Sequence, residues 1–441
     1  MAEATNLTGI TCENGGSDEL GDDDFVSLIH PSDDRIVEDK VNVEELKSSR
    51  PSAVAKIRKL PPWMDRYVDT RRVTPLVALH NEIVGFCKLM EPHPDELKER
   101  EALVEKFSDL VNSTFKTGCK VEVFGSQVTG LCLPTSDIDI AIQIEGDQEG
   151  ETKEDSTGKV QNADSETSEM DNWSTQLGGN PLQQLGNALR DQWQSDLSYL
   201  EVIENTRVPL VKFTHAPTNI SVDVCFNQKT GVQAATLMKR YMDAIPPLRP
   251  LTFVLKYFLA SRGLNEPYTG GVGSFMLQLM IVSFLQNRER DAFNYSRASL
   301  YNLGALLVEF LELYSTDFNY VTTGFSVRYD GFYFPKGASE RKEAFFQQNR
   351  PFSMSIENPL ETGADVGKPS FRMQMVQRSF EVAFKLLLCY VSDPVTPTAS
   401  ILASILPVTD EMVKRLTFTR LNPLQSKRSD GQPRTKKQKV N

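Results

Sequence analysis

The sequence predicts an α+β fold in which a strand-rich region precedes a mainly helical one. Between Lys120 and Phe226, apolar and polar residues alternate, as they do in strands whose two faces differ. From Gly231 onward, apolar residues recur every three or four positions, which indicates amphipathic helices. With 441 residues, 40% of them hydrophobic, the chain is long enough for two or three domains.

The sequence of the N-terminal part predicts a disordered segment followed by two helices. Residues 1–50 contain 13 acidic and 4 basic residues, so we expect 1–58 to be a disordered acidic segment. A first helix is predicted over 75–91, with Thr74 as its cap and Pro75 in its first turn. We expect this helix to pack on the helical domain, and a second helix to begin near Pro94.

The strand-rich region contains a polar interruption. Residues 146–179 are rich in Glu, Asp, Ser and Thr, and we interpret them as a disordered insert between strands. In the C-terminal half a hairpin is predicted over 318–336, between helices. The predicted helices cover 232–245, 251–262, 273–286, 300–314 and 371–390.

A Gly-Ser pair followed by two alternate acids gives the strongest functional signal. Gly125-Ser126 precedes Asp137-Ile138-Asp139 by eleven residues. Isoleucines at alternate positions place one strand face in a core, so both aspartates are predicted on the other face. Two close carboxylates repel one another, and their hard oxygen atoms suit Mg²⁺. The Gly-Ser turn offers N–H groups and a hydroxyl to phosphate oxygens.

A third acid fits the same arrangement. Asp223 stands among alternating apolar residues in a later predicted strand, from Ile220 to Phe226. Taken alone, it is more simply a solvated strand residue. Together with Asp137 and Asp139 it completes a set of carboxylates that can hold two Mg²⁺ ions, with Mn²⁺ as an alternative, for nucleotidyl transfer.

With these motifs in place, the chain resembles the noncanonical nuclear poly(A) polymerases of the topoisomerase-related-function type, within the DNA polymerase β-like nucleotidyltransferase superfamily. The resemblance covers about residues 60–390. The segments that carry it are 61–63, 124–140, 207–213, 222–227, 255–257, 262–265, 269–275, 333–336 and 365–367.

The resemblance implies a polymerase β-like palm with a mixed sheet and a mainly helical central domain, with nucleotide and RNA bound between them. The implied domains are a catalytic domain over 59–230, a central domain over 231–405, and a C-terminal tail over 406–441 with a basic cluster. The implied activity is template-independent addition of short poly(A) tails to nuclear RNA 3′ ends, from ATP, for surveillance and exosome decay.

The resemblance also assigns nucleotide contacts. Gly125, Ser126, Lys256 and Ser274 are expected to hold phosphates. Phe275 is expected to stack on the base where the family usually has Tyr, although a core position is the alternative. Gly231 is expected either to let the backbone approach the ribose or to serve as a simple turn residue.

The segment 356–368 resembles the family's base-recognition loop, with two departures. Ala364 stands where poly(A) polymerases usually have Asn and where uridylyltransferases have His. Lys368 stands where the family usually has Arg. The missing His argues against UTP and does not establish ATP, so a terminal uridylyl- or mixed-nucleotide transferase remains an alternative.

Charge and composition bound the possible partners. Once the acidic segments 1–50 and 145–172 and the basic end 427–441 are set aside, the rest carries a net charge of +1. We therefore expect weak RNA affinity for the chain alone. Six scattered cysteines contain no zinc-knuckle spacing and suit a reducing compartment. No apolar run is long enough to span a membrane.

These features define the expected partners and location. The resemblance implies a zinc-knuckle RNA-binding protein and an RNA helicase linked to the nuclear exosome. The basic cluster in 427–441 is either a nuclear import signal or an RNA-binding tail, and we expect a nuclear location, in nucleoplasm or nucleolus. A catalytically silent scaffold for RNA-decay factors is the alternative outside enzymes.

Overall fold

The computed structural model describes residues 60–64, 73–115, 119–144, 179–204, 206, 208–290, 301–338, 342–392 and 400–421. The predicted acidic segment 1–58, all but the last residue of the predicted insert 146–179, and the basic cluster in 427–441 lie outside the described residues. None of the helices within the described ranges combines the length and apolar character that a bilayer crossing needs. The five cysteines in these ranges are free thiols.

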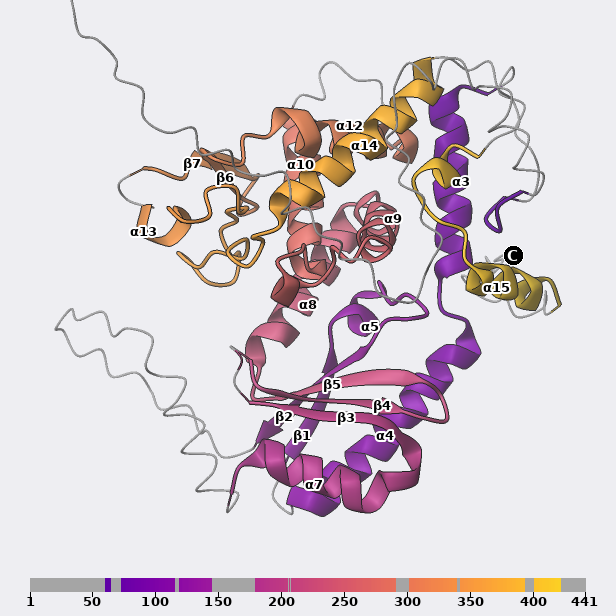
Figure 1. The fold of residues 1–441 in the computed structure, drawn as a ribbon, viewed down its shortest axis with the longest axis vertical. Helices are drawn as coiled ribbons and strands as arrows, with labels where there is room; N and C mark the ends of the chain where they lie inside the picture. The colour runs from indigo at the N-terminus through magenta and orange to yellow at the C-terminus, as the bar shows by residue number, and fades with distance from the viewer. Residues whose placement is uncertain are drawn as a thin grey trace, which may run out of the picture. The chain divides into compact units, whose positions relative to one another are not determined.

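A five-stranded mixed sheet forms the first half of the fold (Figure 1). Its order is β1-β2-β5-β4-β3; β2 and β5 run parallel, and the other neighbours are antiparallel. This confirms the predicted fold class. The strands are β1 (Cys119–Phe124), β2 (Ile138–Ile144), β3 (Leu197–Ile203), β4 (Leu210–His215) and β5 (Ile220–Phe226).

Two helices cover one face of this sheet. Helices α4 (Pro94–Phe115) and α7 (Pro181–Trp193) lie below the sheet in Figure 1, opposite the short helix α5 (Ser126–Thr129). Phe107 of α4 and Trp193 of α7 connect these helices to the sheet. Both rings pack on Phe213 of β4, at centroid distances of 5.6 and 5.9 Å. The sequence pattern did not predict α7, which begins where Asn180 Oδ1 accepts a hydrogen bond from the Leu182 N–H.

The second half of the fold is helical and has its own hydrophobic core. The periodic segments form α8 (Lys229–Ala244), α9 (Leu248–Ala260), α10 (Ser274–Arg290), α12 (Leu303–Glu312) and α14 (Met373–Ser392). The predicted hairpin is present as β6 (Thr323–Ser326) and β7 (Phe332–Pro335). The short elements are η2 (Gln194–Asp196), η3 (Pro267–Thr269), the π-helical turn η5 (Leu313–Asp317), α13 (Lys342–Phe345) and η6 (Leu402–Ser404).

Helix α3 (Pro75–Met90) precedes the sheet in sequence but packs on α9 and α12. Its buried residues, including Leu79, Ile83 and Phe86, belong to the core of the helical half. The helical half is therefore discontinuous in sequence. Thr74 stands at the N-cap position and Pro75 in the first turn, as predicted, although the Thr74 side chain makes no capping hydrogen bond.

A helix also lies within the predicted C-terminal tail. Residues 410–421 form α15, and its Arg415 is only 7% exposed. The guanidinium donates to the carbonyls of Leu89 and Glu91 and pairs with Glu96 at 2.5 Å. Since Glu91 and Glu96 flank the junction between α3 and α4, α15 fixes the point where the chain passes from the helical half to the sheet.

Candidate active site

The three predicted acids converge at the β2–β5 pair. Asp139 and Asp223 are directly opposite one another in the parallel register of these two strands. Asp137 comes just before β2, which begins at Ile138, so the expectation that it shares a strand face with Asp139 is wrong in detail. All three side chains nevertheless line one cavity. Parallel pairing brings Asp139 and Asp223 together although 84 positions separate them in sequence.

The electrostatics of these acids are unfavourable without a cation. Burial, followed by the charges of Asp223 and Asp137, raises the pKa of Asp139 to about 6. Burial likewise raises the pKa of Asp223, against the opposing effect of Lys212. The site therefore concentrates negative charge that the surrounding protein does not fully neutralise.

Lys212 places an ammonium group between two of the acids. It lies opposite Asp223 in the β4–β5 register, and its Nζ is 3.1 Å from Asp137 Oδ2 and 3.1 Å from Asp223 Oδ1. Although burial lowers it, the pKa of Lys212 is raised overall because both carboxylates face the ammonium. The sequence analysis did not single out this side chain, because its role depends on the register of β4 against β5.

A fourth acid faces the same charges. Glu266 follows α9, lines the cavity, and accepts a hydrogen bond from Asn265 Nδ2 at 2.6 Å. Burial raises its pKa, and the charges of Asp137 and Asp223 raise it further. Sequence reasoning missed this residue, because nothing in a loop glutamate's local pattern reports proximity to strands far away in the chain.

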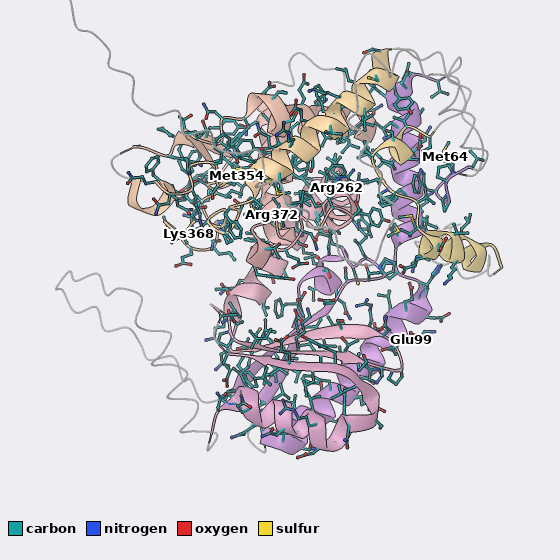
Figure 2. The ribbon with its side chains drawn as sticks, in the orientation of Figure 1. Met64, Glu99, Arg262, Met354, Lys368 and Arg372 are labelled. Atoms are coloured by element: carbon teal, nitrogen blue, oxygen red, sulfur yellow. The ribbon has the colours of Figure 1, made fainter. Side chains whose placement is uncertain are left out.

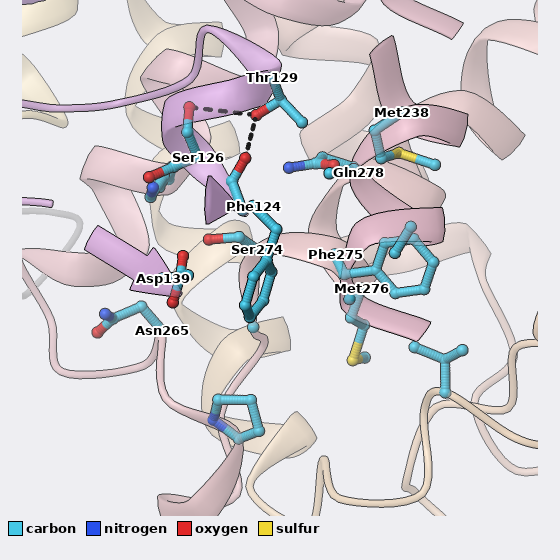
Figure 3. Close-up of a pocket in the computed structure, with 18 of the residues that line it drawn as sticks. Phe124, Ser126, Thr129, Asp139, Met238, Asn265, Ser274, Phe275, Met276 and Gln278 are labelled. Atoms are coloured by element: carbon cyan, nitrogen blue, oxygen red, sulfur yellow. Dashed lines mark hydrogen bonds between the residues drawn. The ribbon is translucent and has the colours of Figure 1, made fainter. Parts of the chain in front are cut away.

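The Gly-Ser turn is built around Asp139. Gly125 has φ of +68°, and a Cβ placed there would lie 2.0 Å from Asp139 Oδ2. Only glycine meets both conditions. Thr129 Oγ1 donates to the Gly125 carbonyl at 3.1 Å and thereby closes the turn. Its contact with the Ser126 carbonyl is drawn in Figure 3. Ser126 follows at the start of α5 and lines the cavity.

Lys256 approaches from the helical half. It projects from α9, and its Nζ donates to the Leu131 carbonyl at 3.4 Å and to Ser136 Oγ at 3.3 Å. Both acceptors lie in the loop that leads to Asp137. Burial lowers the pKa of this ammonium, while the carboxylates of Asp139 and Asp137 act in the opposite direction. A second cation thus faces the acids from across the cavity.

The cavity has a volume of about 690 Å³, within the usual range of small-molecule sites. Ser274 reaches it from the first residue of α10, and Phe275 lines it while also packing on the helical core (Figure 3). Phe275 therefore lies partly in the core and partly at the cavity wall, and its stacking on a base stays a prediction.

Gly231 is not a turn residue. It lies in the first turn of α8 and lines the cavity, and a Cβ there would come within 2.7 Å of the Phe124 ring. The simple-turn alternative is therefore wrong, because the glycine lets a helix rest on the aromatic residue that ends β1.

The loop 356–368 contributes Ala364 to the cavity but not Lys368. Ala364 lines the cavity beside Asn358 and Asp365, whereas Lys368 is exposed and is not among the lining residues. Asp365 Oδ1 accepts hydrogen bonds from the N–H groups of Ile356 and Gly367 at 2.9 and 2.7 Å. Gly367 packs against Met354 in the core, and Pro369 lines the cavity. With both neighbours held in this way, the Lys368 side chain extends into solvent instead of the cavity.

No group of three or more His, Cys, Asp or Glu side chains in the described ranges is close enough, as placed, to enclose a metal ion. The donor chemistry still fits Mg²⁺, since carboxylate oxygens face one cavity and Lys212 Nζ already occupies a cation's position between two of them. Asp137, Asp139 and Asp223 are therefore the residues that would hold such an ion.

Two family models match this chain. A model of the poly(A) RNA polymerase, mitochondrial-like, central palm domain matches residues 79–243, and a model of the Cid1 family poly A polymerase matches residues 302–363. The inactive non-canonical poly(A) RNA polymerase protein Trf4-2 of Drosophila melanogaster is 32% identical over 368 residues, which cover 82% of this chain and 81% of the relative. The chain belongs to the noncanonical poly(A) RNA polymerase family.

Other members extend the comparison. The poly(A) RNA polymerase CID14 of Cryptococcus neoformans is 32% identical over 74% of this chain and 38% of its own length. The chain spans less than half the length of the first curated relatives it matches. The solved polymerase core of TRAMP, an RNA surveillance complex, superposes with a TM-score of 0.64 at 27% identity, covering 79% of this chain and 100% of that one.

Proposed function

We propose that this noncanonical poly(A) RNA polymerase family member is a template-independent adenylyltransferase that adds short poly(A) tails to RNA 3′ ends. The observation that carries the proposal is the convergence of Asp137, Asp139 and Asp223 with Lys256 on one cavity of nucleotide size. A buried cluster of like charges destabilises a fold unless a ligand compensates it. Cations together with a triphosphate are ligands that would do so.

Two Mg²⁺ ions, or Mn²⁺ ions, bound at the aspartates would neutralise phosphate charge and acidify the RNA 3′-hydroxyl. The chain's own residues position the reactants. Asp137 and Asp139 would hold the ions against the nucleotide, and Asp223 would orient the 3′-hydroxyl. That hydroxyl attacks the α-phosphorus, its new P–O bond forms as the bond to the β-phosphate breaks, and pyrophosphate leaves.

Three groups would stabilise the triphosphate. The N–H groups at the start of α5, with Ser126, and the hydroxyl of Ser274 supply neutral donors. Lys256 supplies a positive charge that offsets the charge accumulating on pyrophosphate. Phe275 would stack on the base from the cavity wall. Lys212, which bridges two acids in this structure, would release Asp137 and Asp223 when stronger cations compete for them.

Base selection rests on the loop beside Ala364. A small side chain leaves room for a purine and offers no ring nitrogen to a uracil, which supports ATP over UTP. Partners and location follow from the family: we propose a nuclear protein that acts with a zinc-knuckle RNA-binding protein and an RNA helicase in exosome-linked decay.

The decisive experiment is extension of a 5′-labelled oligoadenylate with each NTP singly and Mg²⁺, with and without a basic RNA-binding partner. We expect ATP-dependent extension that the partner increases. Preference for UTP would support the uridylyltransferase alternative.

The inactive relative named above makes a silent scaffold the second candidate. A lack of extension with every nucleotide and partner would support that alternative, provided that the purified chain is folded.

The partner's effect should depend on salt. With a near-neutral body and two acidic segments, the chain alone should bind RNA weakly and with a shallow salt dependence. Deleting 1–50 and 147–172 should tighten binding modestly at low salt and little at high salt, because screening removes the repulsion.

A further inference from the structure

A turn at the edge of the cavity exposes a tyrosine to solvent. Glu266 and Pro267 line the cavity, and the next residue, Tyr268, leaves 81% of its surface exposed. Gly270 ends this turn with φ of +85°, and Gly271 returns to the cavity wall. The ring therefore stands outside the cavity on a turn whose two ends are fixed in the cavity wall.

A second exposed aromatic residue is held against the same turn. Phe371 is 46% exposed, and its ring rests on Gly270, where a Cβ would lie 2.5 Å from the ring. The Arg372 N–H donates to the Gly270 carbonyl at 2.9 Å. These contacts lock the segment 369–372 to the turn 267–270.

Basic side chains accompany the two rings. Arg350 Cζ lies 5.0 Å from the centroid of the Phe371 ring. Lys368 and Arg372, both labelled in Figure 2, flank Pro369 and Phe371 in sequence, and Pro369 lines the cavity. Within the described part of the chain, no acidic side chain forms an ion pair with any of these three cations. We call Tyr268, Arg350, Lys368, Phe371 and Arg372 the aromatic–basic rim.

The rim has the chemistry of a single-strand nucleic-acid platform. Exposed rings stack on bases of any identity, and unpaired cations attract phosphates. None of the five side chains lines the cavity, so a nucleotide bound there does not use them. If the 3′ end of an RNA enters the cavity, the nucleotides on its 5′ side would lie against the rim.

We propose that the aromatic–basic rim binds the acceptor RNA upstream of its 3′ end, with Tyr268 and Phe371 stacking on bases and the three basic residues contacting phosphates. This rests on the proposed function, because it takes the cavity as the place where the 3′ end reacts. The rim would also be a local positive surface, which a net charge of +1 for the chain without its charged segments does not reveal.

The test is binding of 5′-fluorescein-labelled (A)₁₂ and (A)₃ to the full chain by anisotropy at low salt. Tyr268→Ala should raise the Kd for (A)₁₂ roughly tenfold, within the usual range for loss of one base-stacking ring. Tyr268→Trp should stay within about twofold of wild type, because it keeps a stacking surface. The ratio of variant to wild-type Kd should be much smaller for (A)₃, which is too short to occupy both cavity and rim.

The matched control is Tyr329→Ala, since Tyr329 is 92% exposed in the β6–β7 hairpin and does not line the cavity. It should not change the Kd. Arg350→Ala and Lys368→Ala should each reduce the slope of log Kd against log salt by about one, as expected for a lost phosphate contact.

The rim assignment is wrong if Tyr268→Ala leaves (A)₁₂ binding within twofold of wild type, or if Tyr329→Ala weakens it equally. Unchanged RNA binding would leave the rim as a surface for a protein partner. Tyr268-dependent binding in a chain that extends no RNA would overturn the adenylyltransferase proposal while keeping the rim. If the chain extends RNA and Tyr268→Ala changes extension at no RNA length, the rim proposal is overturned and the adenylyltransferase proposal is kept.

Discussion

The acids at the β2–β5 pair and Lys336, which directly follows β7, both carry buried charge, but the surroundings of these charges differ. The Asp139 carboxylate accepts none of the hydrogen bonds found within the described residues, and four other carboxylates line the same cavity, those of Asp137, Asp223, Glu266 and Asp365. Lys336, which is 2% exposed, donates to the carbonyls of Tyr320, Ser353 and Pro351 at 2.5, 2.6 and 3.3 Å.

This difference separates a ligand site from a structural one. The Lys336 ammonium donates hydrogen bonds to three backbone carbonyls. Two of these belong to Pro351 and Ser353, so the side chain connects the end of the β6–β7 hairpin to the segment 351–353. Around Asp139, Lys256 and Lys212 compensate the negative charge only in part, and the carboxylate faces a cavity. Asp365 combines both features, since Oδ1 accepts two backbone hydrogen bonds while the buried Oδ2 has no hydrogen-bond partner in the structure. Uncompensated charge, more than burial alone, marks the site where a ligand is needed.

The largest effect should follow removal of the uncompensated charges. The variant Asp137→Ala with Asp139→Ala should lose nucleotide addition by roughly a thousandfold, because Asp223 alone remains of the three proposed ion ligands. Its thermal stability should be unchanged or higher, since the repulsion is relieved. Extension rates with Mg²⁺ and melting temperature test this together. Retention of more than about a tenth of the wild-type rate would contradict the metal role.

The opposite result is expected at the structural charge. Lys336→Met should lower the free energy of unfolding by about 3 kcal/mol, because the carbonyls of Tyr320, Ser353 and Pro351 lose their donor, the first two in buried contacts. Urea denaturation measures the change. Lys385→Met is the matched control, since Lys385 lies exposed on α14 and forms an ion pair with Glu381 one turn away. It should cost under about 0.5 kcal/mol. A Lys336 variant as stable as the control would show that these hydrogen bonds contribute little.

A pH series sharpens the comparison further. The pKa of Asp139 is raised from 3.8 to about 6, so its ionisation destabilises the fold. This penalty is absent below about pH 3.8, grows between 3.8 and 6, and is complete above 6. Without divalent ions, Asp139→Asn should therefore be more stable than wild type at pH 7.5, by about 2 kcal/mol, and the advantage should shrink at pH 4.5.

Asp137→Asn provides the control for that series. Asp137 forms an ion pair with Lys212, so its neutralisation removes an attraction as well as a repulsion. It should give no comparable gain in the free energy of unfolding at pH 7.5. Equal stabilisation by both substitutions would mean that Lys212 does not distinguish the two acids.

The sequence was sufficient for features that depend on local pattern. Alternation predicted β2 and β5, and the Gly-Ser…Asp-x-Asp spacing predicted the acids. Helical periodicity predicted α8, α9, α10, α12 and α14. The features it missed depend on contacts between distant segments. Lys212 reaches two acids only through the register of β4 on β5, and Glu266 reaches them only after α9 packs against the sheet's loops.

The same reasoning explains the errors at single residues. A simple turn was one of two alternatives for Gly231, because its contact, the Phe124 ring, is more than a hundred positions away in sequence. Lys368 was expected at the nucleotide by motif position, but the path of the loop directs it to the surface. Motif position gives the neighbourhood of a side chain, whereas the backbone decides its direction.

The smallest predicted effect concerns the base. Ala364 lines the cavity, and its backbone is fixed by hydrogen bonds to Glu361 and Asn358, so a larger side chain would project from a defined position. Ala364→His should raise the ratio of kcat/KM for UTP over ATP by at least about threefold, or ~0.7 kcal/mol, because an imidazole can hydrogen-bond a uracil edge and occupies purine space. Glu361→His, on the exposed side of the same loop, is the control and should leave the ratio unchanged. A shift below threefold for Ala364→His, or an equal shift for the control, would mean that the base is read elsewhere in the cavity, whose wall also includes Phe275, Asn358 and Asp365.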